Sequence, residues 1–360
     1  MGSFTPDVPQ PWIETPLIYS APLSRSAGCN VFLKLENLQP SGSFKSRGIG
    51  NMMIRAVEAA PRDKEVHFYC SSEGNAGLAC ATTAAAIGRK ATIVVPRTAK
   101  PFVLAKLRDL DAEIVQVGGS WNEADAHLRE VLLVNHDPSG LAVYVPPFNH
   151  ADIWEGASTL VDEVVRQMKA QRGDGVPIDG IVCNVGGGGL LNGVMEGVER
   201  HKAQLGRRTA DSEQRTTPKV LAMETEGADC LNKSVQAGDM VTLPAITSIA
   251  LSLGAKRVSE KSWEWAQRAG EDLTSATVPD AEAAMACVKF LDDSRILVEV
   301  ACGATLATVY NGGLRKYLGK ELNDDQWAQR NVVMVVCGGS NTNLQTVYGY
   351  RETYGKSVSF

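Results

Sequence analysis

The stretch S-G-S-F-K-S-R-G, residues 41–48, decides how the rest of the chain is interpreted. Small turn residues precede an aromatic ring, Phe44, and a lysine, Lys45, at the predicted start of a helix. Most lysines are solvated surface side chains, and that is the default interpretation of Lys45 taken alone. Any other role for this amine depends on which further motifs the chain carries.

The composition is that of a globular protein large enough for two domains. The chain has 360 residues, of which 44% are hydrophobic and 21% charged, and its net charge is −5. There is no basic excess of the kind that nucleic-acid binding uses, so nucleic acid is not an expected partner. No segment approaches the roughly 18 to 20 apolar residues of a membrane span, and the start shows no secretory signal, so we expect no membrane partner and a cytoplasmic location.

The eight cysteines are scattered along the chain without a CxxC pair, and several lie inside apolar runs. This pattern predicts reduced, buried thiols and not a disulfide framework or a zinc site.

Short β-branched runs alternate with longer segments of helical periodicity. We predict strands at 66–70, 91–96, 112–118, 142–147, 180–186, 219–225 and 331–339. We predict helices at 77–88, 101–110, 153–173, 190–206 and 280–293. Apolar strands separated by crossover helices indicate an α/β protein with largely parallel sheets flanked by helices. The strands are too many for one compact sheet, so we expect two domains with a cleft between them, and an exposed polar loop at 201–218.

The stretch N-V-G-G-G-G-L-L-N-G, residues 184–193, takes a strand through four glycines into a helix. Glycines let the backbone approach a ligand closely, and the first N–H groups of a helix attract an anion. The turn therefore favours a phosphate site over a plain tight turn. It lacks the GxGxxG spacing of a dinucleotide site, which argues against a dinucleotide-binding oxidoreductase.

Two further loops follow strands. S-S-E-G-N-A-G, residues 71–77, offers hydroxyls and N–H groups at a helix start, which suit a carboxylate, or only a plain helix cap. V-C-G-G-S-N, residues 336–341, puts Cys337 at the carboxyl end of a strand, where α/β sheets bind ligands, although a buried thiol is the commoner role. Together with a phosphate cradle and a carboxylate cradle, Lys45 fits an amine that forms an imine with pyridoxal phosphate, with Phe44 against the ring.

At these motifs the sequence resembles the serine/threonine dehydratases of the fold type II, tryptophan-synthase-like family of pyridoxal-phosphate enzymes. The likeness also takes in PPFNHADIWEG, VLAMETEGAD, ITSIALSLGAK and ILVEVACGA, so it covers nearly the whole chain in order. It implies a large cofactor-binding domain at 1–40 and 147–360 and a small domain at 41–146 that carries the lysine motif and the asparagine loop. The cofactor is expected in the cleft between them, and a homodimer is implied.

The resemblance also implies residue roles. Lys45 would hold the cofactor as a Schiff base and act as general base, Asn75 would bond its 3′-oxygen, and Cys337 would face the ring nitrogen. The phosphate would be held by Gly186, Gly187, Gly188, Gly189 and Leu190. The substrate would be held by Ser43, Ser72, Asn75 and Ala76. A monovalent cation such as K⁺ would be bound by the carbonyl groups of Gly186, Ala228, Leu253 and Ala255.

The chain departs from the dehydratase pattern at Glu73, where those enzymes carry a small residue, and at Ser252, near the ring, where the mammalian-type enzymes have alanine. A carboxylate beside a bound carboxylate substrate is repelled unless it is protonated, turned away or paired with a cation. Three interpretations of Glu73 stay open: a second catalytic acid/base, a contact for a polar or cationic part of a larger substrate, or a side chain without function.

The leading hypothesis is an ammonia-lyase that removes the β-hydroxyl and amino groups of L-serine, L-threonine or a related β-substituted amino acid. The alternatives are β-elimination, β-replacement or racemisation on another amino acid, for which Glu73 leaves room. An alternative from another class of protein is a non-catalytic amino-acid-binding protein on the same scaffold.

Overall fold

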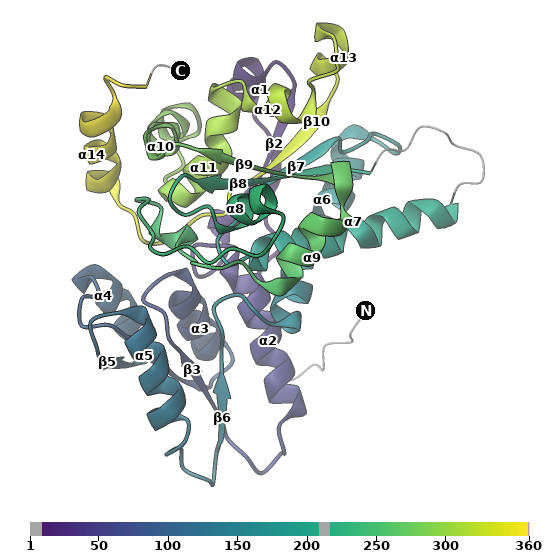
Figure 1. Cartoon of the computed structure of the whole chain (residues 1–360). Coiled ribbons are helices and arrows are strands. Elements are labelled where there is room, and N and C mark those ends of the chain that lie inside the picture. Colours follow the sequence, from purple (N-terminus) through teal and green to yellow (C-terminus); the bar gives the residue numbers. More distant parts are fainter. Residues whose placement is uncertain (1–8, 209–216, 359) are drawn as a thin grey trace. The chain divides into compact units, whose positions relative to one another are not determined.

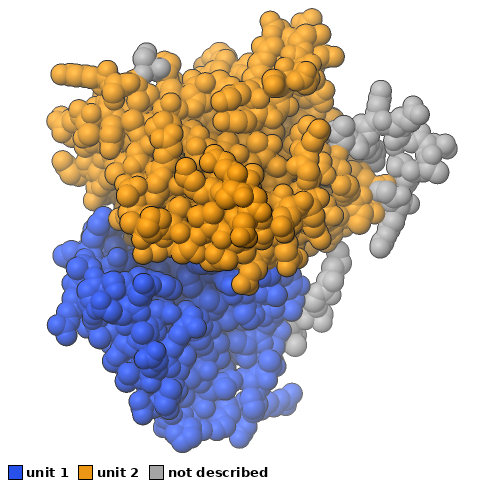
Figure 2. Space-filling model, in the orientation of Figure 1, with its two compact units in different colours: residues 1–13, 38–157 blue, residues 14–37, 158–360 orange. Residues whose placement is uncertain are grey.

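The computed structural model describes residues 9–208, 217–358 and 360, and the chain divides into two compact units. Unit 1 consists of Met1–Ile13 and Leu38–Ala157, and unit 2 of Glu14–Asn37 and Ser158–Phe360 (Figure 2). In the described part of the chain, no helix is long and apolar enough to cross a lipid bilayer.

Unit 1 is built on a four-stranded, fully parallel sheet in the order β5-β4-β3-β6 (Figure 1). Its strands are β3 (Val66–Cys70), β4 (Lys90–Val95), β5 (Glu113–Gln116) and β6 (Leu141–Tyr144). Its helices are α2 (Lys45–Ala59), α3 (Asn75–Ala86), α4 (Pro101–Asp109), α5 (Trp121–His127) and the one-turn π-helix η2 (Leu128–Leu132).

Alternation along β3 sorts its side chains between the two faces of this sheet. Phe68 and Cys70 belong to the larger core cluster, with residues of α2, α3 and α4. Tyr69 belongs to a separate cluster with Ala124 of α5 and Leu128 of η2. Both faces are therefore covered, as continuous apolar strands require.

Unit 2 contains a six-stranded sheet in the order β1-β2-β10-β7-β8-β9, parallel except for the β1–β2 pair. Its strands are β1 (Leu17–Tyr19), β2 (Asn30–Lys34), β7 (Gly180–Asn184), β8 (Lys219–Thr225), β9 (Leu273–Val278) and β10 (Asn331–Val335). The longer helices are α6 (Ala151–Arg172), which begins in unit 1, α7 (Gly189–Arg208), α10 (Asp280–Ser294), α11 (Val300–Tyr310) and α14 (Leu344–Tyr354). The shorter ones are α1 (Ala21–Ala27), α8 (Cys230–Ala237), α9 (Glu260–Arg268), α12 (Gly313–Leu318) and α13 (Asp324–Ala328), with 3₁₀ turns η1 (Glu36–Leu38), η3 (Leu251–Leu253) and η4 (Gly270–Asp272).

The core of unit 2 includes α11, a helix that is apolar on all sides. Its residues from Val300 to Val309 are all buried, and it packs against β7, β8, β9, β10 and α10. A helix that lacks a polar face is stable only where neighbours surround it, so α11 lies inside the unit.

The predicted α/β class with two largely parallel sheets is confirmed, and each predicted strand and helix is present with ends shifted by four residues or fewer. Three strands were not predicted: β1, β2 and β9. The loop predicted at 201–218 was wrong at its start, because α7 continues to Arg208; residues 209–216 lie outside the described part. The eight cysteines are buried and form no disulfide, as predicted.

Candidate cofactor and substrate site

The lysine motif lies in unit 1 at the start of α2. Lys45 is the first residue of the helix, directly after Phe44. Its Nζ donates a hydrogen bond to the main-chain oxygen of Pro147 at 2.5 Å and lies 5.3 Å from the centroid of the Phe44 ring. The Ser41 and Ser46 hydroxyls, 2.8 Å apart, close the turn ahead of the helix. The amine is thus partly buried and held beside the ring, unlike an ordinary surface lysine.

The asparagine loop lies in the same unit, at the start of α3. Asn75 is the first helical residue and Gly74 the cap, and the N–H of Gly74 donates to the Ser72 hydroxyl at 3.1 Å. A Cβ at position 77 would lie 1.9 Å from the carbonyl oxygen of Ser72. Only Gly77 therefore allows the loop to fold this closely against the first turn of the helix. The first N–H groups of a helix have no partner within it, and here they lie beside the serine-rich loop.

The buried polar atoms of unit 1 that have no hydrogen-bond partner include Ser43 Oγ and Glu73 Oε2, in the lysine motif and the asparagine loop. Buried polar atoms are normally satisfied, so each can receive a polar group of a ligand or a water molecule. Burial raises the pKa of Glu73, and the Lys100 ammonium offsets part of that rise. A raised pKa favours the neutral carboxylic acid, which reduces the repulsion of a substrate carboxylate expected from the sequence.

The glycine turn lies in unit 2, between β7 and α7. Gly188 has φ +100°, and a Cβ there would lie 1.9 Å from Ser262 Oγ. The helix begins at Gly189 with buried Leu190 next, and its first internal hydrogen bond runs from Asn192 N to Gly188 O at 2.8 Å. At position 188 the turn is therefore backed too tightly for a side chain, and the first N–H groups of the helix, which have no partner within it, can receive an anion.

A buried hydroxyl and amide network lies behind the glycine turn. Ser262 Oγ donates to Asn192 Oδ1 at 2.7 Å, Asn192 Nδ2 donates to Ser259 Oγ at 3.0 Å, and Ser259 N donates to Gly187 O at 3.0 Å. This network was not predicted. The available signal in the sequence was Asn192, an amide among apolar residues at the start of α7, and it is fully buried.

Cys337 follows β10 by two residues and is 4% exposed. Asn184 Nδ2, from the end of β7, donates to its Sγ at 3.2 Å. A hydrogen bond with Cys302 and burial raise the pKa of the Cys337 thiol well above its ordinary value. The group that was expected to face the ring nitrogen is thus a neutral thiol, as the sequence interpretation requires.

Glu299 is a further residue that was not predicted from the sequence. It is 5% exposed, and its carboxylate accepts hydrogen bonds from the Ser252 hydroxyl and, at 2.8 Å, from Asn341 N. A Cβ at Gly339, φ +116°, would lie 2.2 Å from this carboxylate. Glu299 therefore ties Ser252 to the backbone of the loop that follows Cys337.

Of the four carbonyl positions expected to bind a cation, Gly186 lies close to Leu253, because a Cβ at position 186 would be 3.1 Å from Leu253 Cα. The Leu253 carbonyl already accepts from Ala255 N at 2.7 Å. Ala228 is fully buried two residues before Cys230, whose Sγ lies 3.7 Å from Gly186 O. Among the described residues there is no group of three or more His, Cys, Asp or Glu side chains that could hold a metal ion.

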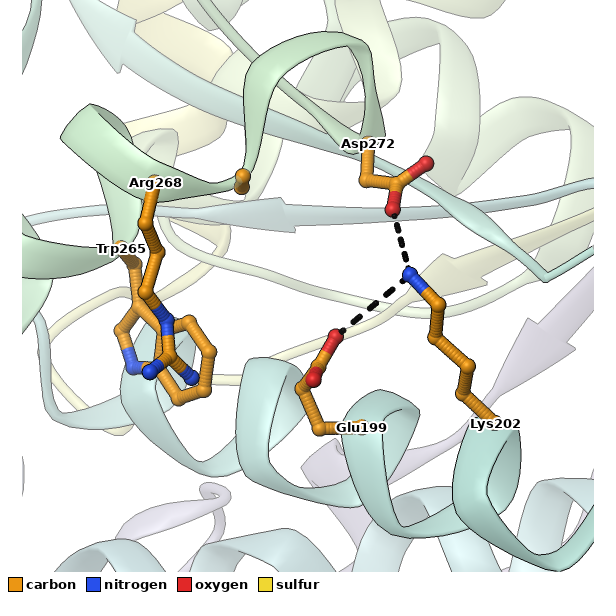
Figure 3. A pocket seen from close by; sticks show the side chains of 6 residues that line it. Glu199, Lys202, Trp265, Arg268 and Asp272 are labelled. Carbon is orange, nitrogen blue, oxygen red and sulfur yellow. Dashed lines mark hydrogen bonds and ion pairs between the residues drawn. The ribbon is translucent and has the colours of Figure 1, made fainter. Parts of the chain in front are cut away.

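Another hollow of unit 2 is lined by residues of α7, α9 and η4 and has a volume of about 260 Å³ (Figure 3). Lys202 pairs there with Asp272 at 3.1 Å and with Glu199 at 4.0 Å, and the Arg268 guanidinium stacks on Trp265 at 3.9 Å. None of the motif residues lines it, and its lysine is paired with both carboxylates, so we assign it no ligand.

Comparisons with known proteins agree with these motifs. Residues 8–338 match the family described as pyridoxal-phosphate dependent enzyme. The chain belongs to this family. It is 39% identical to the human protein named serine dehydratase-like, over 96% of this chain and 95% of the relative. It is 36% identical to the catabolic L-serine/threonine dehydratase of Saccharomyces cerevisiae, over 89% of this chain and 85% of the relative.

A solved structure is also similar: an L-serine ammonia-lyase from the fungus Rhizomucor miehei. It superposes with a TM-score of 0.80 at 35% identity, covering 96% of this chain and 99% of that one. The cofactor of this pyridoxal-phosphate dependent enzyme is therefore pyridoxal 5′-phosphate, within a fold type II architecture. The described residues fit that group: a glycine turn without room for a Cβ at position 188, a partly buried amine beside an aromatic ring, and a neutral thiol.

Proposed function

We propose that this pyridoxal-phosphate dependent enzyme is an ammonia-lyase that converts L-serine or L-threonine to a 2-oxo acid and ammonia. The observation that carries the proposal is the identity of 36% to 39%, over 89% or more of the chain, with relatives named for serine or serine/threonine dehydratase. The neutral Cys337 thiol supports it independently, because it does not favour a protonated ring nitrogen.

We assign the cofactor as follows. Lys45 holds its aldehyde end, and Phe44 lies on its ring. Asn75 bonds the 3′-oxygen, and Cys337 and Ser252 lie near the ring. The phosphate is held by Gly186, Gly187, Gly188, Gly189 and Leu190. In this assignment the larger unit binds the cofactor phosphate, and the smaller unit supplies the lysine and the asparagine loop.

The substrate is held by the loops of unit 1. Ser72 and the N–H groups at the start of α3, with Asn75 and Ala76, receive the substrate carboxylate, because helix N-termini stabilise anions. The buried hydroxyl of Ser43, which has no protein partner, forms a hydrogen bond with a polar atom of the substrate. These contacts orient the Cα–H bond toward the amine of Lys45.

When bound, pyridoxal phosphate supplies a conjugated ring that withdraws electrons from the substrate Cα. Lys45 Nζ, when free of the cofactor, would take the Cα proton as general base. The β-hydroxyl would leave as water with the proton that Lys45 returns, and the released enamine would tautomerise to an imine that water hydrolyses to the 2-oxo acid and ammonia. The neutral thiol of Cys337 limits delocalisation into the ring, which favours prompt loss of the leaving group over transamination.

Glu73 supports a second candidate within the same chemistry. Its buried Oε2 has no protein partner, so this carboxyl group can contact a polar or cationic part of a larger amino acid, or exchange a proton as a second acid/base. Elimination, replacement or racemisation on another amino acid then becomes the main activity. Glu73→Ala separates the two: a gain in serine deamination supports a pocket adapted to another substrate, and loss of all activity makes Glu73 catalytic.

Three further assignments come from the family likeness. We propose that the carbonyl groups of Gly186, Ala228, Leu253 and Ala255 bind a monovalent cation such as K⁺, that the enzyme is a homodimer, and that it acts in the cytoplasm. Activity in potassium chloride against choline chloride tests the cation. Light scattering tests the assembly, and imaging of a fluorescent fusion tests the location.

The decisive experiment is a screen of amino acids with detection of 2-oxo acid and ammonia, and mass spectrometry for other products. The purified enzyme should absorb visible light through its bound cofactor, and Lys45→Ala should abolish the band and the activity. Lys90→Ala, at an exposed lysine of β4, is the matched control and should change neither. A colourless protein that binds no pyridoxal phosphate would favour a non-catalytic amino-acid-binding protein instead.

A further inference from the structure

Ser71 is the first residue after β3, and α5 forms hydrogen bonds with both its hydroxyl and its main-chain oxygen. It is fully buried, and its hydroxyl donates a hydrogen bond to Asp125 Oδ1. Its main-chain oxygen accepts from Trp121 Nε1 at 2.5 Å. Backbone and side chain of this residue are therefore fixed by one helix that is 50 positions away in the sequence.

Asp125 is the centre of a small polar network. It is 8% exposed, and besides Ser71 it accepts from the Tyr144 hydroxyl at 2.8 Å and pairs with Arg129 Nε at 2.8 Å. Arg129 also donates to the Tyr144 hydroxyl at 2.9 Å and stacks over its ring at 4.4 Å. A buried carboxylate with three hydrogen-bonded partners is fixed in position, and its charge is balanced by the guanidinium.

The next residues form the asparagine loop, which is fixed from its other side by α3. Ser72 O lies against Gly77, and Ser72 Oγ accepts from Gly74 N. On its strand side the loop continues directly from Ser71, so the bonds that α5 makes to Ser71 hold the end of the loop that joins β3.

We infer that Asp125 is a positioning residue for this enzyme: through Ser71 it sets the place of Ser72 and Asn75, which contact the substrate carboxylate and the cofactor. Asp125 itself contacts neither. The inference rests on the proposed function for the roles of Ser72 and Asn75, whereas the mechanical link between Asp125 and the loop is independent of it.

Two substitutions remove the hydrogen bond between Ser71 and Asp125, one at each partner. Asp125→Ala deletes the acceptor, and Ser71→Ala deletes the donor while leaving the other partners of Asp125 in place. A hydrogen bond to a charged group is worth enough that each variant should raise KM for L-serine about tenfold, with kcat changed by less than about threefold. Asp125→Asn keeps an acceptor oxygen for Ser71 and should restore KM to within about threefold of the native value.

The double variant decides whether Asp125 acts through Ser71. If it does, Asp125→Ala in the Ser71→Ala background adds nothing, because the bond is already absent. If the two effects on KM multiply, Asp125 acts by another route and the inference is wrong. Glu123→Gln, a carboxylate two positions away on α5 that accepts from Gly119 N, is the matched control and should leave KM unchanged.

Hydrogen exchange read by mass spectrometry provides a test without turnover. Asp125→Ala should speed amide exchange about tenfold in the peptide that covers residues 71–78 and leave the peptides of α2 unchanged. Equal acceleration everywhere would show a general loss of stability, and no acceleration would show that the loop does not depend on Asp125; either result overturns the inference. A native enzyme that does not turn over serine refutes the proposed function, while the exchange result still decides the role of Asp125.

Discussion

Gly188→Ala should disable the glycine turn, and the structure separates two causes of damage. At φ +100° an alanine is strained, which costs about 1–2 kcal/mol. Its Cβ would also lie 1.9 Å from Ser262 Oγ and 3.0 Å from Ser262 Cβ, so one of the two segments must move. Overpacking of this kind typically costs about 1–3 kcal/mol more. We therefore expect a loss of about 2–5 kcal/mol in the free energy of unfolding, within a total of about 5–15 kcal/mol.

The matched control is Gly238→Ala at the end of α8. Gly238 also has a positive φ, +69°, but no heavy atom lies within 4 Å of a Cβ built there. It should show only the backbone strain of about 1–2 kcal/mol. Urea unfolding of the cofactor-free protein measures both variants, and titration with pyridoxal phosphate measures affinity, which only Gly188→Ala should weaken.

A compensating change tests the cause directly. Ser262→Ala removes the oxygen that collides, although the Cβ contact remains. Adding it to Gly188→Ala should recover part of the lost stability, even though the change alone leaves Asn192 Oδ1 without its donor. If the double variant is no more stable than the sum of the two single losses predicts, steric collision is not what makes glycine necessary here.

Three other predictions concern charge. Burial raises the pKa of Glu73, so its carboxyl is neutral below that pKa and charged above it; KM for serine should rise as the pH passes upward through that raised pKa in the native enzyme and not in Glu73→Gln. Identical profiles would contradict this. Iodoacetamide at pH 8 should leave Cys337 unmodified by mass spectrometry, because only the thiolate reacts and burial with a hydrogen bond to Cys302 opposes it. Lys34→Met should cost about 3–5 kcal/mol in urea unfolding, since it removes the buried ammonium that lies 2.6 Å from the Glu163 carboxylate. A cost below 1 kcal/mol would show that the pair is not buried in solution.

Strand prediction succeeded where apolar β-branched residues ran without interruption. The segments 66–70 and 219–225 were predicted with both ends correct. β9, Leu273–Val278, was missed because threonine and serine residues interrupt its run of apolar residues. β2 was missed because it ends in Lys34, which is fully buried through its pair with Glu163. A charge in a strand indicates exposure until its partner is known, and that partner is 129 positions away.

The site residues divide in the same way, into those with a local sequence signal and those without one. The residues that contact ligand in the proposed function stand in short motifs, because one loop at a strand end must supply several contacts at once. Lys45, Asn75 and the glycine turn could be proposed from the sequence for that reason. Glu299 could not, because it shows no local pattern and gains its role from Ser252 and Asn341, which the fold brings to it.

A loop rich in glycine is held in position by residues that are distant from it in the sequence. A loop made of small residues has few side chains with which to fix itself, so its position must be set by polar groups behind it. In unit 1 the carboxylate of Asp125 does this through Ser71, and in unit 2 the network of Ser262, Asn192 and Ser259 does it, with Ser259 N donating to Gly187 O at 3.0 Å. Such bonds each contribute about 0.5–1.5 kcal/mol, or about 1.5–3 kcal/mol where one partner is charged. The loss of that contribution is enough to move a loop by favouring an alternative arrangement. Substitutions behind the motifs should therefore change ligand affinity although the side chains concerned contact no ligand.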